Sequence, residues 1–224
     1  MSAQVIVSYD GTPNDDDAIA LGRMLGAAGA ELALAYVRHS REFDPRREEL
    51  AAHDAQQRLA RGAQLLGDGE VARHVVFGPS TADSLAELAA REGAALIVFG
   101  SDYRTPPGHA EPGTSAQHLI EGGPVAVAVA AAGLRLRAQS AIETIAVPLA
   151  GPRNDAARQT AAALAQALDA RVVGPGDGPV DLIVVGSQPG APAGRIALGG
   201  AERSELARAR SSVLVLPAQT PLAL

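Results

Sequence analysis

Residues 6–17, IVSYDGTPNDDD, recur in altered form as residues 145–156, IAVPLAGPRNDA, at an offset of 139. A second pair, LIVFGS at 96–101 and LIVVGS at 182–187, lies at an offset of only 86, so the second copy is 53 residues shorter. Internal repetition constrains the architecture before any local assignment is made. It predicts a complete domain at residues 1–133 and a truncated second copy at residues 134–224.

The first copy alternates between short apolar runs and segments with helical periodicity, which is typical of a parallel sheet with crossover helices. Asn14 is the expected N-cap of the first helix, and Asp15, Asp16 and Asp17 are expected to face its dipole in the first turn. The fold class is therefore α/β, with an open, parallel, five-stranded sheet and helices on both faces. The predicted strands are 5–9, 31–38, 73–78, 94–100 and 124–130, and the helices between them begin near residues 14, 44, 82 and 115.

The second copy keeps the first strand (144–149), a helix, the strand 182–186, a helix near 201–209 and the last strand (212–217). It lacks the long helix, the third strand and the helix after it, so the deletion removes one flank of the sheet. The segment RVV at 171–173 is harder to place, because only seven residues would return the chain to the strand at 182. They reach about 23 Å, whereas parallel crossovers usually need a dozen residues or more. We expect 171–173 to be weakly paired or absent from the sheet.

The last strand of each copy, AVAVA at 126–130 and SVLVL at 212–216, is uncharged and apolar. Each would lie at the edge of its own sheet, where an exposed apolar strand invites pairing. We expect the two strands to cover each other and to make the chain an internal pseudo-dimer. The alternative is that loops of each domain cover its own edge.

Composition restricts the classes of function. The 224 residues are 47% hydrophobic and carry a formal net charge of −6, which disfavours a nucleic-acid partner. No apolar run reaches the length of a membrane span and no signal peptide is recognisable, so a cytoplasmic location is expected. The chain has no cysteine, and all 19 of its cationic side chains are Arg, which excludes disulfides, a P-loop and a Schiff-base lysine. The five histidines lack ligand spacing, and no metal site is expected.

Residues suited to ligand binding follow the first and fourth predicted strands, at the edge where doubly wound sheets bind their ligands. Asp10 ends the first strand and offers a carboxylate to ribose or adenine hydrogens. The loop 100–115 follows the fourth strand and enters a helix, whose free N–H groups suit a phosphate. The alternatives are that Asp10 is a turn or capping residue and that Thr114 is an N-cap.

At these residues the chain resembles a tandem universal stress protein. That family has a five-stranded parallel α/β domain, an Asp at the end of the first strand and an ATP-binding loop of the form G-x2-G-x9-G-[S/T]. Here the loop runs from Gly100 through Tyr103 to Gly113-Thr114, with the family spacing and with Tyr103 in place of the middle glycine. The resemblance covers the first copy and, with the deletion, most of the second.

The resemblance implies an adenine-nucleotide site in the first copy, for ATP, with or without Mg. Asp10 would lie near the adenosine and Val37 near the adenine. The loop residues implied around the ribose and phosphates, with Tyr103 at the altered position, are Gly100, Ser101, Tyr103, Gly113, Thr114 and Ser115.

Two departures weigh against that site. Tyr103 replaces a glycine that would let the backbone approach a ligand at positive φ, and the prolines at 106, 107 and 112 remove N–H donors. Arg104 and His109 in the same loop are side chains that could reach a polyphosphate.

In the second copy Leu149 stands at the position of Asp10 and Gly200 at that of Thr114, so this copy is interpreted as a non-binding partner.

Two functions follow. The first is a nucleotide-binding stress protein that is not an enzyme, with slow ATP hydrolysis left open. The second is a nucleotide-free scaffold that works through an unidentified protein partner, in which the loop is degenerate. Further association of the pseudo-dimer is left open as well.

Overall fold

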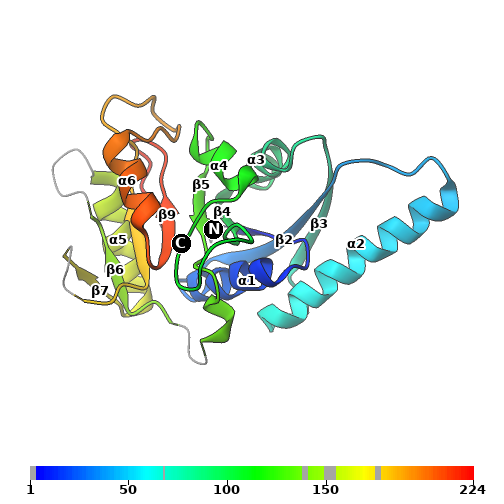
Figure 1. Cartoon of the computed structure of the whole chain (residues 1–224), viewed down its shortest axis with the longest axis horizontal. Helices are drawn as coiled ribbons and strands as arrows, with labels where there is room; N and C mark the ends of the chain where they lie inside the picture. The colour runs from blue at the N-terminus through cyan, green and yellow to red at the C-terminus, as the bar shows by residue number, and fades with distance from the viewer. Residues whose placement is uncertain (1–3, 68, 138–140, 149–154, 175–177) are drawn as a thin grey trace.

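The computed structural model describes residues 4–67, 69–137, 141–148, 155–174 and 178–224. Its centre is a nine-stranded sheet in the order β3-β2-β1-β4-β5-β9-β8-β6-β7 (Figure 1). Every neighbouring pair is parallel except β5 and β9. The chain is therefore α/β, as predicted. Among the described residues, no helix is long and apolar enough to cross a membrane.

The elements follow the predicted order closely. The strands are β1 Gln4–Ser8, β2 Glu31–Arg38, β3 Ala72–Phe77, β4 Ala94–Phe99, β5 Ala126–Val129, β6 Thr144–Ala146, β7 Arg171–Val173, β8 Leu182–Val185 and β9 Ser212–Val215. The helices are α1 Pro13–Gly26, α2 Pro45–Leu66, α3 Thr81–Glu92, α4 Thr114–Ile120, the 3-10 turn η1 Leu134–Leu136, α5 Asp155–Leu168 and α6 Gly200–Arg208.

The seam between the two copies is the antiparallel pair β5 and β9, which confirms the predicted pairing of the two apolar edges. Val127 lies opposite Val215, and Ala128 lies opposite Leu214. All eight residues of the two strands are buried. The ladder joins both copies into one continuous sheet, so neither apolar edge is open to water.

The strand order beyond the seam repeats the order before it. β9-β8-β6-β7 corresponds to β5-β4-β1-β2, and within the described residues α2, β3 and α3 have no counterpart in the second copy. The expectation that 171–173 would be weakly paired or absent is wrong, because β7 pairs with β6 over three residues. A strand this short rises only about 10 Å, so a short connection can return along it.

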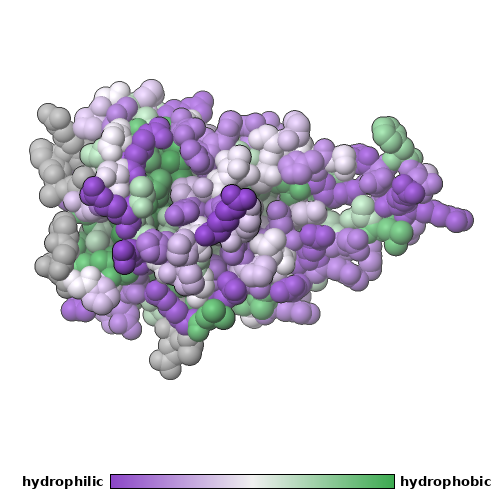
Figure 2. Space-filling model, viewed as in Figure 1, coloured by the Kyte–Doolittle hydropathy of each residue, from purple (hydrophilic) through white to green (hydrophobic). Residues whose placement is uncertain are grey.

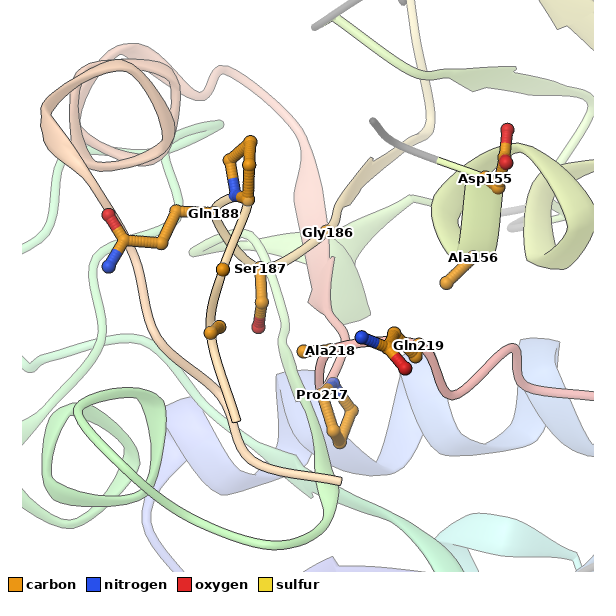
Figure 3. Close-up of a pocket in the computed structure, with 11 residues that line it drawn as sticks. Asp155, Ala156, Gly186, Ser187, Gln188, Pro217, Ala218 and Gln219 are labelled. Atoms are coloured by element: carbon orange, nitrogen blue, oxygen red, sulfur yellow. The ribbon is translucent and has the colours of Figure 1, made fainter. Parts of the chain in front are cut away.

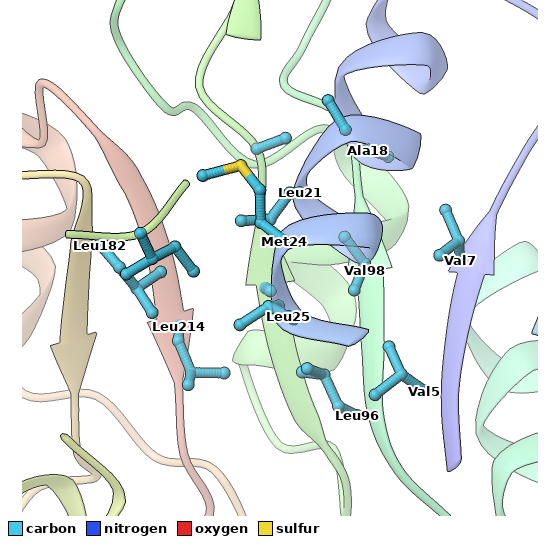
Figure 4. Close-up of a cluster of buried hydrophobic side chains, with 14 of the residues drawn as sticks. Val5, Val7, Ala18, Leu21, Met24, Leu25, Leu96, Val98, Leu182 and Leu214 are labelled. Atoms are coloured by element: carbon cyan, nitrogen blue, oxygen red, sulfur yellow. The ribbon is translucent and has the colours of Figure 1, made fainter. Parts of the chain in front are cut away.

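Helices cover both faces of the sheet. α1, α2 and α5 pack on one face, and α3, α4 and α6 pack on the other. On the first face the apolar core crosses the seam: Met24 and Leu25 of α1 lie in the same cluster as Leu182 of β8 and Leu214 of β9 (Figure 4). The two copies therefore share a core as well as a sheet.

The start of α1 differs from the sequence-based expectation. Thr12, not Asn14, is the N-cap: its hydroxyl accepts from the Asp15 amide, and the Asp15 carboxylate accepts from the Thr12 amide at 2.9 Å. This reciprocal capping box satisfies two free donors of the helix end. Asp17 is not a solvated dipole partner but is fully buried. Its carboxylate accepts from the Gly133 and Arg135 amides and from the Arg135 guanidinium, each at 2.8 Å.

Candidate functional site

The candidate site lies at the carboxyl ends of β1 and β4. These strands are neighbours, and the chain leaves β1 toward β2 on one side and β4 toward β5 on the other. Such a reversal of strand order opens a crevice in which doubly wound sheets bind their ligands. Asp10 follows β1 and Gly100 follows β4, so the fold brings the two predicted segments to the same edge.

Asp10 presents a carboxylate that accepts no hydrogen bond from the described residues, and the residue is exposed. Its backbone is held firmly, because its amide donates to Asp15 at 3.1 Å and its carbonyl accepts from the Arg58 guanidinium at 2.9 Å. Desolvation of the carboxyl group and the nearby Asp15 charge raise the pKa of Asp10, whereas Arg58 and His39 lower it. A fixed, partly desolvated carboxylate without a partner is suited to accept hydrogen bonds from a ligand.

His39 and Arg58 flank Asp10, and the sequence patterns did not single out either of them as a partner of Asp10. His39 lies just after β2; its Nδ1 is 3.1 Å from the Gly78 carbonyl and its Nε2 is 3.4 Å from the Thr81 hydroxyl. A carbonyl only accepts, so Nδ1 carries the hydrogen and Nε2 faces Thr81. Arg58 comes from α2, 48 residues after Asp10, and no local pattern could have indicated this approach.

Gly100 is packed against the start of α1 rather than against open space. A Cβ at this position would lie 2.1 Å from the Asn14 carbonyl oxygen, and the Asn14 side-chain Nδ2 donates to the Ser101 carbonyl at 2.8 Å. The glycine is therefore needed for the close approach of two backbone segments. This contact fixes the loop after β4 to the first turn of α1.

Ser101 is buried, and its hydroxyl is occupied within the chain. It donates to the Ala130 carbonyl at 2.6 Å and accepts from the Glu111 amide at 3.2 Å. Ser187, 86 residues later, makes the equivalent bonds to the Leu216 carbonyl at 2.8 Å and from the Ala197 amide at 3.1 Å. The loops after β4 and β8 are thus held by the same pair of serine hydrogen bonds. The Ser101 hydroxyl supports its loop and is not free to bind a ligand.

Tyr103 stands out from the loop and is 74% exposed. Its ring lies 4.9 Å from the Arg104 guanidinium carbon, and its φ is not positive. The loop has therefore taken a conformation that a tyrosine accepts without left-handed strain.

The end of the loop leads into α4. Gly113 is the N-cap, so Thr114 is the first helical residue and not the cap itself. No side chain caps this helix end among the described residues, and Thr114 is exposed. Backbone N–H groups in the first turn are thus available to an anion. Ser115 is half-buried beside them, whereas Val37 is buried in the core beneath the edge, 5% exposed.

The second copy has a hollow of about 260 Å³ at the corresponding edge (Figure 3). Residues 217–219 line one side, and Asp155 and Ala156 of α5 line another. Ala156 stands where the first copy has Asp17, so this position offers no carboxylate to the segment after β9. Gln219 matches Gly133 and shares its left-handed backbone, with φ of 59° and 81°. Leu149, the predicted counterpart of Asp10, lies outside the described residues.

The arrangement of β1, β4 and the loop between β4 and α4 corresponds to the family that the motif suggested. A model of the Universal stress protein family matches residues 1–131. The chain belongs to the universal stress protein family. No curated protein matches it.

Solved structures show the same fold over nearly the whole chain. A universal stress protein from Archaeoglobus fulgidus DSM 4304 has a TM-score of 0.70 at 15% identity, covering 97% of this chain and 99% of that one. A putative universal stress protein from Pseudomonas aeruginosa UCBPP-PA14 has a TM-score of 0.66 at 14% identity, with 96% and 93% covered. At this identity the likeness concerns the fold alone.

Proposed function

We propose that this universal stress protein binds an adenine nucleotide in its first copy and acts through the bound state rather than through catalysis. The observation that carries the proposal is the Asp10 carboxylate: it is exposed, partly desolvated and without a hydrogen-bond partner among the described residues. Such a carboxylate is free to accept hydrogen bonds from the hydroxyl or amino hydrogens of a ligand. Asp10 would hold the nucleoside, with Val37 beneath the adenine.

The phosphates would lie toward the start of α4. Gly113, Thr114 and Ser115 begin this helix without a side-chain cap, which favours an anion at its backbone N–H groups. Gly100 and Ser101 would support the site without contacting the ligand. Gly100 lets the loop pack closely against Asn14, and the Ser101 hydroxyl binds the Ala130 carbonyl. Tyr103 would stay in solvent. ATP, with or without Mg, is the proposed ligand.

Replacing Asp10 by Asn tests the assignment to the first copy. We expect nucleotide affinity to fall by about tenfold or more, because a charge-assisted hydrogen bond is worth roughly 1.5–3 kcal/mol. Isothermal titration with ATP measures the loss, and the thermal melting of the unliganded protein should be unchanged because the Asp10 side chain accepts no hydrogen bond from the part of the chain that the structure describes.

Asp155→Asn is the matched control, since Asp155 lines the hollow of the second copy. Its affinity should equal that of the unaltered chain. If Asp155→Asn weakens nucleotide binding and Asp10→Asn leaves it unchanged, the ligand binds to the second copy and the assignment is overturned.

A nucleotide-free scaffold is the second candidate function. It is favoured by the closure of the loop after β4, where the Ser101 hydroxyl donates to the Ala130 carbonyl and accepts from the Glu111 amide. If the intact chain binds no adenine nucleotide at millimolar concentration, this function is the better account, and its partner would be a protein.

A further inference from the structure

Helix α2 extends well beyond the sheet (Figure 1). It has 22 residues and is therefore about 33 Å long. Its buried side chains begin only at Ala55 and continue through Leu59, Ala63 and Leu66. The first ten residues form an arm without buried side chains, and its first turn is held by two hydrogen bonds of 2.9 Å between the Arg38 guanidinium and the Glu48 carboxylate.

The outer face of α2 carries a stripe with leucines at both ends. Helical geometry places residues spaced by three or four on one face, and this face is opposite to that of Ala55 and Leu59. Leu50 is 65% exposed and Leu65 is 42% exposed. The exposed residues of the stripe, in order, are Leu50, Asp54, Gln57, Arg61 and Leu65.

The stripe is complementary to itself when two copies of the helix run antiparallel. In that arrangement Leu50 meets Leu65 of the other copy, Asp54 meets Arg61, and Gln57 lies next to the two-fold axis. The Asp54 carboxylate has no partner among the described residues. Arg61 makes one contact of 3.3 Å with Asp16, which leaves further guanidinium donors for a second carboxylate.

The tip of the arm adds an apolar anchor. Phe43 is fully exposed, at 105%, and precedes the N-cap Asp44. An apolar residue at this position often packs against the fourth helical residue, but here that residue is Glu48, which binds Arg38. Hydrophobic side chains are visible at the outer end of the molecule in Figure 2. The Phe43 ring is therefore left without an apolar partner in its own chain.

A hollow with apolar and charged walls lies at the other end of the helix. Its volume is about 500 Å³; Gly26, Leu32, Leu66 and Val71 contribute apolar walls, and Arg23, Glu31 and Glu70 line its rim. Antiparallel pairing brings the tip of one arm to this end of the partner helix. The surface thus offers two leucine contacts, two ion pairs and two aromatic anchors under one symmetry axis, as isologous dimers require.

We infer that α2 is the contact surface of a two-fold dimer of this chain, with the outer stripes antiparallel and Phe43 seated at the far end of the partner helix. The seam between β5 and β9 already occupies the apolar strand edges, so this contact is a separate one. It concerns association and does not depend on nucleotide binding.

Cysteine cross-linking tests the register, because the chain has no cysteine of its own. Leu50→Cys/Leu65→Cys should form a covalent dimer under mild oxidation. The two sites on one helix are about 22 Å apart, so a disulfide within the chain is excluded. Either single variant should form no covalent dimer, whereas a mixture of the two should cross-link. Cross-linking of Leu50→Cys alone at the same rate, or none in the double variant, would overturn the inference.

Sedimentation velocity of the intact chain tests the contact without cysteine. We expect a shift from 22.7 kDa toward twice that mass between low micromolar and submillimolar concentration. Asp54→Arg should raise the dissociation constant about tenfold by opposing Arg61 of the partner, and Asp54→Arg/Arg61→Asp should restore it. Glu49→Arg makes the same charge change away from the stripe and should not alter it. A mass of 22.7 kDa at every concentration contradicts the dimer.

Discussion

Residues 134–224 expressed alone are expected to aggregate or to remain molten. Without the first copy, β9 loses the partner strand that pairs with Val213, Leu214 and Val215. Its core also loses α1, because Leu182 and Leu214 share a cluster with Met24 and Leu25. An apolar edge strand without cover pairs with other chains. Size-exclusion chromatography and thermal melting by circular dichroism measure the outcome.

Co-expression of residues 1–133 with 134–224 is the control for this experiment. The two segments should assemble into a soluble complex, since β5 and β9 restore the ladder across the seam. A soluble, monomeric 134–224 that melts cooperatively would show that the second copy folds by itself, and the shared core would then be unnecessary for it.

Asp17→Ala is expected to lower the free energy of unfolding by about 3–5 kcal/mol, the usual cost of breaking a buried ion pair. The change removes the acceptor of two amides and of the Arg135 guanidinium, all from the segment that leads out of the first copy. The amides of Gly133 and Arg135 would lose the charged acceptor that the buried Asp17 provides. Urea unfolding gives the value.

Asp155→Ala is the comparison, because Asp155 also belongs to the first turn of a helix but pairs with Arg158 at the surface. Its loss should cost less than about 1 kcal/mol. Equal costs for Asp17→Ala and Asp155→Ala would show that the tie between α1 and residues 133–135 contributes little.

The repeat and the apolar strands made most of the fold predictable. Offsets of 139 and 86 place the deletion, and an apolar, uncharged edge needs a partner, which is why the pairing of β5 and β9 could be expected. The pairing of β7 could not be expected, because the sequence does not show how long this strand is. A three-residue strand is short, so the connection from β7 to β8 has far less distance to cover than it would beside a strand of full length.

The details of the site were less predictable, because they depend on contacts between distant residues. Thr12 and Asn14 are both good N-caps, and the choice depends on the reciprocal bonds with Asp15. The Ser101 hydroxyl is used by Ala130, 29 residues later. Asp17 binds residues more than 100 positions away, so its sequence context indicates only a helix start. Sequence patterns identify which segments reach the edge of the sheet, but they do not show which polar groups are already paired.

Calorimetric titration of the purified, nucleotide-free chain with ATP, ADP and AMP, with and without Mg²⁺, decides whether the first copy is a working site. We expect micromolar binding of one nucleotide per chain, lost in Asp10→Asn and kept in Asp155→Asn. Absence of heat with every nucleotide at millimolar concentration would contradict the proposed nucleotide site and leave the scaffold function.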